Sequence, residues 1–161
     1  FIVFVGTERL VLDVSGVTGM LTPYYDTYLK SRLHASASGK LLLSSCSASQ
    51  REELVGPVPY RAYTAKTITD ADALARELDQ TAQRGYATNL DENFVGISAM
   101  GALILCGPEQ AAGCLLVAGA SERFGEARIG EIGQALREKA NLFAFGSPSL
   151  RAIKSMFSRL G

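Results

Sequence analysis

The side chains that could carry out catalysis are few and poorly placed for it. The chain of 161 residues holds one histidine, so a serine or cysteine nucleophile activated by histidine would have to use His34. No Gly-x-Ser-x-Gly turn is present, and the sequence offers no second polar partner for this ring. We therefore expect His34 to be a partly buried or capping residue at a helix start, with a small hydrolase as the alternative.

The remaining reactive groups lack the spacing of known sites. The three cysteines, Cys46, Cys106 and Cys114, form no C-x-x-C pair and lie in apolar runs, which predicts reduced core thiols in a cytoplasmic protein. With one histidine and no cysteine pair, we expect no metal site, no cofactor and no catalytic residue. The adjacent carboxylates Asp91 and Glu92 could act as acid and base, but such a pair is expected to be solvated.

The start of a predicted helix is a more promising feature. Small residues and hydroxyls at positions 35–39 precede the apolar run Leu41–Leu43, and Ser36 is the expected cap. Free backbone N–H groups at a helix N-terminus attract anions, and small side chains let a ligand approach them. The same pattern serves plain capping with tight packing, and both interpretations remain open at this point.

Composition narrows the class of function. Lys and Arg together number 16, as do Asp and Glu, so the formal net charge is +0. A surface that binds nucleic acid normally carries a basic excess, so this segment is not expected to bind DNA by itself. No apolar run approaches the roughly 18 residues of a membrane span, so no membrane contact is expected. The chain begins at Phe1 without methionine, and we expect a further segment before it.

The first half of the chain predicts a hairpin followed by short helices. Phe1–Val5 and Leu10–Val14 are predicted as its strands, with Gly6 at the turn. A less regular extended stretch, Met20–Leu29, is expected at a sheet edge because it contains a proline. A capping-box pattern at Ser47–Gln50 starts a second helix after the one described above.

Helices and strands alternate in the second half. After Thr69, apolar residues recur with the helical period up to Gly85, which ends that helix. Three strands are expected next, and the last two form an antiparallel hairpin: Tyr86–Asn89, Ile97–Cys106 and Cys114–Ala120. A final helix carries one apolar stripe and is followed by a shorter second stripe. The first consists of Ile129, Ile132, Leu136, Ala140 and Phe143, and the second of Leu150, Ile153 and Phe157.

The order of these elements predicts the fold class. Strands, helices, strands and helices follow one another without a repeated βαβ unit, which favours an α+β fold with an antiparallel sheet and helices on its faces. No linker is long enough to split the chain, so residues 1–161 are expected to form a single domain.

Four segments resemble the sequence motifs of the IclR family of bacterial transcription regulators. They occur in the family's order and span nearly the whole chain, so together they are specific although each alone is weak. They are His34–Lys40, then Thr64–Thr69 with Gln83–Ala87, then Asp91–Ile97, and finally Gly119–Arg123.

The resemblance implies an effector-binding domain with a GAF-like fold, a twisted antiparallel sheet with helices on its faces and a pocket beside it. Family members bind small metabolites there, often carboxylates such as keto acids, sugar acids or aromatic acids. Binding changes how a homodimer or tetramer holds DNA. The family's N-terminal winged helix-turn-helix is absent from this sequence, so contact with DNA is expected only through that missing part.

The resemblance also implies a set of ligand-contacting residues. By position they are Ala37, Ser38, Asn89, Ile97, Ala99, Leu116 and Ala118. Spacing agrees with this assignment, because Ile97 and Ala99 share one face of a strand, as do Leu116 and Ala118.

Several of these positions depart from the family pattern. Members that bind small keto acids carry Cys at the position of Ala99, Ser at those of Leu116 and Ala118, and Asp at that of Asn89. The more apolar lining predicts a larger or aromatic organic acid, anchored at the backbone amides of Ala37 and Ser38. The alternative is a degenerate pocket in a domain that serves only as an oligomerisation scaffold.

Overall fold

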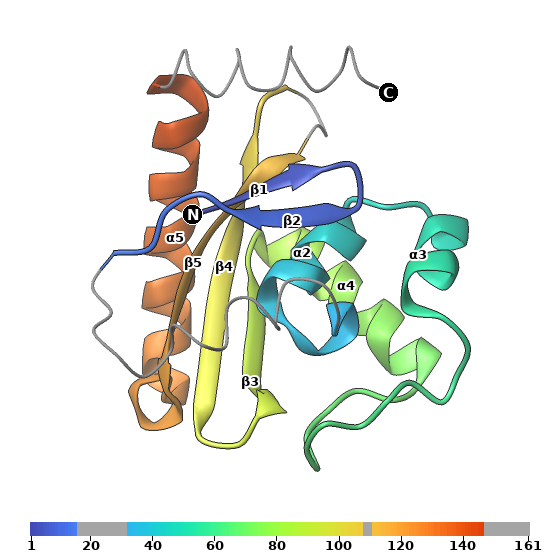
Figure 1. The fold of residues 1–161 in the computed structure, drawn as a ribbon. Helices are drawn as coiled ribbons and strands as arrows, with labels where there is room; N and C mark the ends of the chain where they lie inside the picture. Colours follow the sequence, from blue (N-terminus) through green and yellow to red (C-terminus); the bar gives the residue numbers. More distant parts are fainter. Residues whose placement is uncertain (16–31, 108–110, 147–161) are drawn as a thin grey trace.

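The fold is built on one five-stranded antiparallel sheet. The computed structural model describes residues 1–15, 32–107 and 111–146 (Figure 1). The predicted stretch Met20–Leu29 and the stripe Leu150, Ile153 and Phe157 lie outside these residues. The strand order is β2-β1-β5-β4-β3. The strands are β1 (Ile2–Val5), β2 (Glu8–Val11), β3 (Ala87–Phe94), β4 (Ile97–Leu105) and β5 (Ala111–Ala120).

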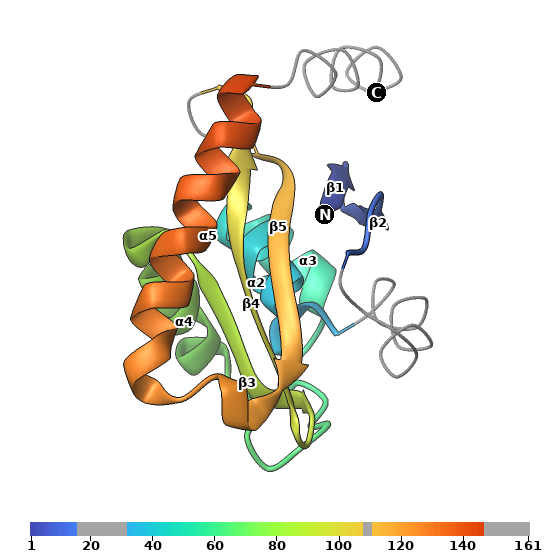
Figure 2. The ribbon, with the colours of Figure 1, turned by 90° about the vertical axis from the view of Figure 1, so that its left-hand side faces the viewer.

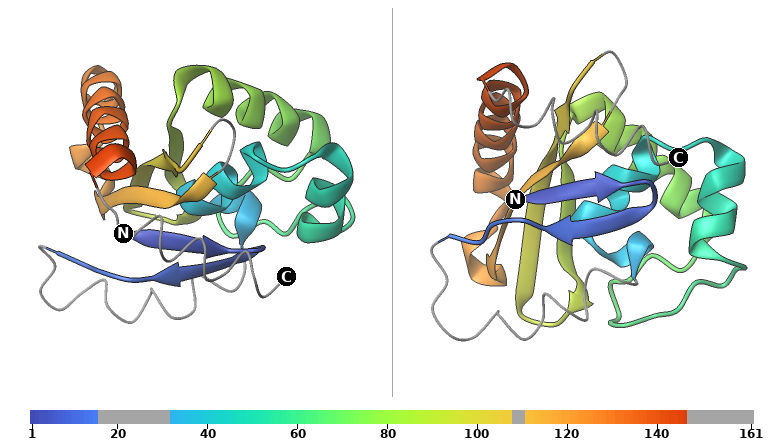
Figure 3. Two further views of the ribbon diagram at one scale, coloured as in Figure 1. Left: turned by 90° about the horizontal axis from the view of Figure 1, so that it is seen from above. Right: turned by 45° about the horizontal axis from the view of Figure 1, so that its top comes forward.

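The helices lie on both faces of this sheet. They are α2 (Ala37–Ser44), α3 (Ala48–Val55), α4 (Ala71–Arg84) and α5 (Glu126–Gly146), with short 3-10 turns at Leu33–Ala35 and Ser121–Arg123. Figure 2 shows α5 on one side of β4 and β5 and the β1–β2 hairpin on the other. Seen from above in Figure 3, the sheet curls, and its β1–β2 end lies on the far side of β3, β4 and β5 from α4 and α5. The predicted α+β class, with a curled antiparallel sheet between helices, is confirmed.

The strand register decides which side chains face which layer. Met100, Ala102 and Ile104 of β4 pack with Leu136 and Ala140 of α5 in one buried cluster. The alternate residues of β4 face the opposite way, toward α2 and the hairpin. The predicted apolar stripe of α5 therefore covers one face, and the other face is left to the elements that hold the candidate site.

Local capping signals fix the helix ends as expected. The Ser36 side chain accepts a hydrogen bond from the Gly39 amide at 3.1 Å, which starts α2. Ser47 and Gln50 form the predicted capping box. Helix α4 is capped by Asp70, one residue after Thr69, and Gly85 ends it with a φ of 75° in the left-handed region.

Several strand boundaries differ from the prediction, and β2 also ends earlier than expected, at Val11. Strand β2 begins at Glu8, because Gly6 and Thr7 alone make the turn and Val5 lies opposite Glu8. Strand β3 continues to Phe94 instead of ending at Asn89, because a register shift between Leu90 and Phe94 carries the chain past the acidic pair. Strand β4 ends one residue earlier than expected, and β5 begins three residues earlier, at Ala111.

The backbone ladder between the hairpin and the rest of the sheet is short. The pairing of β1 with β5 consists of Ile2 opposite Cys114 and Val3 opposite Gly113. A Cβ atom at Gly113 would overlap the backbone carbonyl of Ile2, whereas one at Gly119, in the same strand, would meet only the Phe124 ring at 3.7 Å. The close approach of β1 to β5 thus depends on the missing side chain of Gly113.

We predict that Gly113→Ala displaces the hairpin from β5 and lowers the free energy of unfolding by about 1–3 kcal/mol, the usual cost of overpacking. Denaturant unfolding measures the loss, and hydrogen–deuterium exchange should show faster exchange in residues 2–11. Gly119→Ala is the matched control, and it should leave the unfolding free energy and the exchange rates nearly unchanged. Equal effects of the two substitutions would contradict this account.

Candidate functional site

Five of the seven predicted ligand-contacting residues lie on one face of the sheet. Asn89 of β3 lies opposite Ala99 of β4, and Ala99 lies opposite Ala118 of β5. Directly opposed residues of antiparallel strands point to the same face, as do residues two apart along a strand. Ile97 and Leu116 therefore belong to this face as well. Side chains that contact one ligand on a sheet must point to the same face, and these five residues do.

The other two residues come from the first turn of α2. Ala37 is fully buried and packs in one apolar cluster with Ala99, and Leu116 and Ala118 are packed against it. The same cluster contains Ile2 of the hairpin, with Phe4 and Val11 packed against it. The structure thus brings four of the seven residues together beneath the hairpin. Ile97, at the start of β4, is half-buried and lies outside this cluster.

An arginine that the sequence analysis missed lies at this site. Arg9 of β2 is 3% exposed, and its Nη1 donates hydrogen bonds to Ser36 Oγ at 3.0 Å and to Ser38 Oγ at 2.9 Å. Its neighbour Leu10 is 46% exposed. In β2 the charged residue therefore faces inward and the leucine outward, which reverses the alternation from which buried strand residues are normally inferred.

The Asn89 side chain stabilises the local backbone. Its Oδ1 accepts hydrogen bonds from the Glu92 amide at 2.9 Å and from the Asn93 amide at 3.3 Å. These bonds hold the irregular end of β3, where Asp91 has a φ of 63°. An amide does this without the charge that the family's aspartate would add to a residue only 2% exposed.

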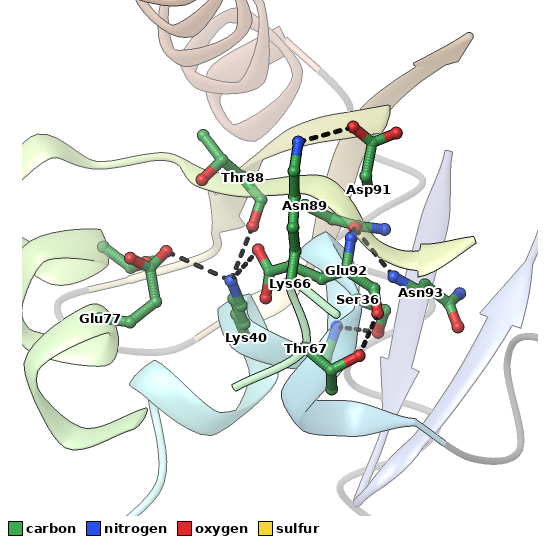
Figure 4. Close-up of polar contacts among 12 residues, drawn as sticks. Ser36, Lys40, Lys66, Thr67, Glu77, Thr88, Asn89, Asp91, Glu92 and Asn93 are labelled. Atoms are coloured by element: carbon green, nitrogen blue, oxygen red, sulfur yellow. Dashed lines mark hydrogen bonds and ion pairs between the residues drawn. The ribbon is translucent and has the colours of Figure 1, made fainter. Parts of the chain in front are cut away.

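A buried ammonium group lies on the other side of α2 (Figure 4). Lys40 is 1% exposed, and its Nζ contacts Glu92 Oε1 at 2.6 Å, the Thr88 carbonyl at 3.0 Å and Glu77 Oε1 at 3.5 Å. Glu77 in turn accepts from Arg84 at 2.7 Å. Burial raises the pKa of Glu92, and the Lys40 charge and hydrogen bond partly offset that rise.

The expectation of a solvated acidic pair was therefore wrong for Glu92. The positive φ at Asp91 turns the chain so that the two carboxylates separate, and only 8% of Glu92 is exposed. Asp91 stays near the surface, where Lys66 Nζ at 2.9 Å, the Gly96 amide and the Ser121 hydroxyl donate to it. These hydrogen bonds, that of Ser121 foremost, lower the pKa of Asp91.

His34 is buried in an aromatic setting. It is 5% exposed, its Nε2 lies 3.0 Å from the Arg61 carbonyl, and its ring lies against Tyr60 and Tyr63. Burial lowers the pKa of His34, the Arg61 carbonyl raises it, and the charge of Lys40 lowers it further. The ring hydrogen-bonds a backbone carbonyl rather than a serine or cysteine, so it is part of the core and not a helix cap.

The cysteines are free and differ in environment. Cys114 is buried in the cluster beneath the hairpin, and burial raises its pKa to about 12. Cys46 and Cys106 are only half-buried, so the expectation of three core thiols holds for Cys114 alone. In the described ranges no group of acidic, histidine and cysteine side chains could hold a metal ion. None of the helices described is long and apolar enough to cross a membrane.

A cavity of about 250 Å³ lies away from the predicted residues, where α2, α4 and α5 meet the end of β4. Its lining consists of Leu41, Ser44, Thr81, Ala82, Gly85, Leu103, Leu105, Arg137 and Asn141. None of the seven predicted residues belongs to it. The face that carries them is instead packed against the hairpin.

A curled antiparallel sheet, with a long helix on one face and a hairpin over the other, is a GAF-like fold. Residues 2–143 match the family described as bacterial transcriptional regulator IclR, C-terminal, and the chain belongs to this family. The resemblance drawn from the four motifs is thereby confirmed. The family consists of transcription regulators and not of enzymes, so the hydrolase alternative for His34 was wrong.

Individual relatives agree with this assignment. The chain is 32% identical over 141 residues to the transcriptional regulator BhcR of Paracoccus denitrificans, covering 88% of this chain and 50% of that protein. The IclR structure of Thermotoga maritima is 29% identical over 89% of this chain and 58% of that one, with a TM-score of 0.71. The curated relatives are longer, and the chain covers 34% of the probable regulator SauR of Cupriavidus necator.

A third structure is a double mutant of the inducer-binding domain of the Acinetobacter transcription factor PobR, in complex with 3-hydroxybenzoic acid. It has a TM-score of 0.68 at 23% identity and covers 89% of this chain and 85% of that one. At this identity the comparison shows that the two chains share a fold.

We predict that Lys40→Met costs about 3–5 kcal/mol of unfolding free energy, because it leaves the Glu92 carboxylate buried without its partner. The double variant Lys40→Met/Glu92→Gln should recover part of that loss, which a double-mutant cycle by urea unfolding measures. Lys66→Met breaks the exposed Lys66–Asp91 pair and is the control, with an expected cost of at most about 1 kcal/mol. A loss for Lys40→Met as small as that of the control would contradict a buried pair.

We predict that His34 makes the stability of the folded protein depend on pH. Above its ordinary pKa of 6.5 the ring is neutral in both states, but below it the unfolded chain binds a proton more readily than the folded one. The free energy of unfolding should therefore fall as the pH drops below 6.5, by at most about 1.4 kcal/mol per pH unit. His34→Gln keeps a donor for the Arg61 carbonyl and should remove this fall.

The contribution of His34 is the difference in unfolding free energy between the wild type and His34→Gln at each pH. Glu92, whose pKa is raised, contributes with the opposite sign and is present in both proteins, so it cancels in the comparison. Urea unfolding curves measured at intervals from pH 8 to pH 5 provide the test. Parallel stability profiles for the wild type and His34→Gln would show that His34 titrates normally in the folded state.

Proposed function

We propose that this chain is the effector-sensing domain of a bacterial transcription regulator and that its effector is a small organic acid. The acid binds on the sheet face formed by β3, β4 and β5, beneath the β1–β2 hairpin. The observation that carries this proposal is the meeting of Ala37, Ala99, Leu116 and Ala118 in one cluster that the hairpin covers. These residues come from α2, β4 and β5, and the family resemblance independently assigns them to one site.

The chemistry of this face favours an acid with a substantial apolar body. Ala99, Leu116 and Ala118 offer no hydrogen bonds, so they suit a ring or an alkyl chain. The first turn of α2 supplies N–H groups and the positive end of a helix dipole, which suit a carboxylate. The complex of the similarly folded PobR domain with 3-hydroxybenzoic acid supports an aromatic acid as the first candidate.

Binding at this face requires the hairpin to move. Ile2, Phe4 and Val11 pack where the ligand would lie, so the closed arrangement and the liganded one are different states. An effector that binds the open state better shifts the population toward it. In the full-length protein of the cytoplasm, a homodimer or tetramer would couple this shift to DNA affinity through an N-terminal DNA-binding domain.

The alternative is a scaffold domain that oligomerises without sensing. The tight packing of the predicted residues favours it, as do the exposed apolar side chains Leu10, Leu12 and Val14, each 46–50% exposed on or after β2. This function predicts a stable oligomer whose thermal midpoint no small acid changes.

A thermal-shift screen of the domain against small carboxylates, from glyoxylate and pyruvate to hydroxybenzoates and longer acids, tests the proposal. An acid present at 100 times its dissociation constant adds about 2.7 kcal/mol of stability, which is a readily visible shift. We predict that aromatic or larger acids stabilise the domain and that glyoxylate does not. If no acid on the panel raises the midpoint, the scaffold function is the better account.

A matched pair of variants then locates the site. Leu116 and Leu115 are adjacent, half-buried and on opposite faces of β5, toward the hairpin and α5 respectively. Leu116→Ser should weaken binding of the stabilising acid about 10-fold or more, the value of one lost leucine contact, and should leave the oligomer intact. Leu115→Ser should leave the affinity within about threefold of the wild type, within the spread expected for a change that touches no ligand.

A further inference from the structure

The cavity of about 250 Å³ where α2, α4 and α5 meet the end of β4 reaches the protein surface. Its floor is buried, since Leu41 is 1% exposed and Thr81 is 2% exposed. Its rim is open, because Arg137 and Asn141 of α5 are exposed and Leu105 is 40% exposed. A small molecule therefore finds space here in the arrangement that the structure shows, whereas the hairpin covers the sheet face.

The size and the apolar lining of this cavity suit a ring or a branched chain. An apolar cavity of about 150 Å³ holds benzene, so about 250 Å³ has room for a ring with one substituent. Leu41, Leu103 and Ala82 supply apolar surface, and a ligand would also cover the exposed part of Leu105. Removing such surface from water is the main source of affinity for an apolar ligand.

The polar side chains of the lining offer mainly hydrogen-bond donors. A guanidinium has five N–H groups and no acceptor, and among the residues that the structure describes no hydrogen bond or ion pair engages Arg137. Asn141 adds an amide. The Thr81 hydroxyl accepts from Arg84 at 3.5 Å and keeps a hydrogen to donate, while Ser44 already donates to the Leu41 carbonyl. The lining residues named above include no aspartate or glutamate, so this site favours a ligand that carries acceptors.

The position of Arg137 leaves a positive charge at the rim. A Cβ atom at Gly85 would lie 2.8 Å from Arg137 Nε and 3.0 Å from its Cδ, so this side chain lies directly over the glycine that ends α4. The C-terminal carbonyls of a helix carry about half an elementary charge, which offsets only part of a guanidinium. Helix α2 also ends beside the cavity, where Ser44, Ser45 and Cys46 donate to its last carbonyls and reduce their charge.

We propose that this cavity is a second binding site, separate from the sheet face, for a small aromatic or branched carboxylate. Arg137 pairs with the carboxylate, because the planar fork of a guanidinium can hold both carboxylate oxygens. Asn141 follows Arg137 by one helical turn on α5 and donates to the same group. The inference does not depend on the proposed function, since none of the seven residues assigned to the sheet face lines the cavity.

Only one layer of side chains separates the two sites. Leu41 lines the cavity and also packs with Ala37 and Ala99 in the cluster beneath the hairpin. Leu103 lines the cavity and is packed against the same cluster. An acid that stabilises the domain can therefore bind at either site, and a thermal shift alone does not distinguish them. The distinction requires a measurement that locates the ligand.

Methyl NMR spectra of the intact domain, labelled at leucine and alanine, locate the ligand. The probes are benzoate, phenylacetate and isovalerate, each titrated to about 10 mM. At least one acid should shift the methyl signals of Ala82 and Leu105 in a saturable way, with a dissociation constant of about 1 mM or tighter. The signals of Ala99 and Ala118 report the sheet face. If no probe shifts Ala82 and Leu105, the inference is wrong, and the proposed function stands if Ala99 and Ala118 respond.

Arg137→Gln tests the role of charge with the acid that binds best and its primary amide. The wild type should bind the acid about 10-fold more tightly than the amide, and the variant should lose this preference while its amide affinity stays within about threefold. Arg137→Lys should keep part of the preference. Arg128→Gln, which removes an exposed arginine of α5 outside the cavity, should bind like the wild type. If Arg137→Gln lowers the unfolding free energy but keeps the preference, Arg137 only stabilises the end of α4 and the inference is wrong.

Filling the cavity tests the site without removing a charge. Ala82→Leu should weaken acid and amide alike by about 10-fold or more, with Leu105 as the reporter. Ala75→Leu, two turns earlier on the same face of α4 and outside the cavity, is the matched control and should change neither affinity. The Leu105 response should persist in Leu116→Ser, which alters the sheet face. Loss of that response in Leu116→Ser but not in Ala82→Leu would assign the acid to the sheet face and overturn the inference.

Discussion

The buried ammonium group of Lys40 is the constraint on which the arrangement of this domain depends. A charge that is 1% exposed is tolerated only with close partners of opposite sign and with its hydrogen bonds satisfied. Glu92 of β3, Glu77 of α4 and the Thr88 carbonyl meet these needs, so one side chain ties α2 to two elements that follow it by 37 to 52 positions. The left-handed residue Asp91 is what brings the Glu92 carboxylate inward for this pairing.

The direction of the Lys40 side chain also determines which side of α2 faces the candidate site. Successive helix residues are rotated by about 100°, so Ser38, two positions earlier, points to nearly the opposite side of α2. With Lys40 directed at Glu92, the Ser38 hydroxyl has to face the hairpin, where it meets Arg9. The polar start of α2 is thus oriented toward the sheet face by an ion pair on its far side. The ion-pair cluster supports the site without needing to touch a ligand.

The features that sequence predicted correctly are those with local causes. The cap at Ser36, the capping box at Ser47 and the end of α4 at Gly85 depend on residues within one turn, so their signals are contained in a few neighbouring letters. The common face of Ala99 and Ala118 follows from alternation along strands, which is equally local. The assignment of these residues to one site came from the family resemblance. Their position beneath a hairpin was not predicted, since nothing local indicates that β1 pairs with β5.

The features that sequence missed have distant causes. Nothing near Glu92 indicates burial, because its partner Lys40 lies 52 positions earlier and its inward direction depends on a positive φ at a residue other than glycine. Arg9 was missed for the same reason, since its partners lie 27 and 29 positions later. The alternation of β2 was misleading there, because a buried arginine and an exposed leucine contradict the pattern by which strand faces are assigned. Such a reversal is typical of functional positions, where local preferences yield to the needs of a site.

Under the proposed function, the packing of the hairpin on the strand face makes a small acid a poor effector. Opening the site removes the contacts of Ile2, Phe4 and Val11 with the strand face, and the ligand has to replace them. To move a two-state equilibrium from 1:99 to 99:1, a ligand needs a preference of about 5.5 kcal/mol for the open state. Hydrogen bonds from the first turn of α2 to a carboxylate contribute about 1.5–3 kcal/mol each at best, and they do not distinguish the closed from the open state, because α2 is not part of the hairpin. The difference has to come from apolar surface that only the open state offers, so the size of the ligand's apolar body decides whether it acts as a signal.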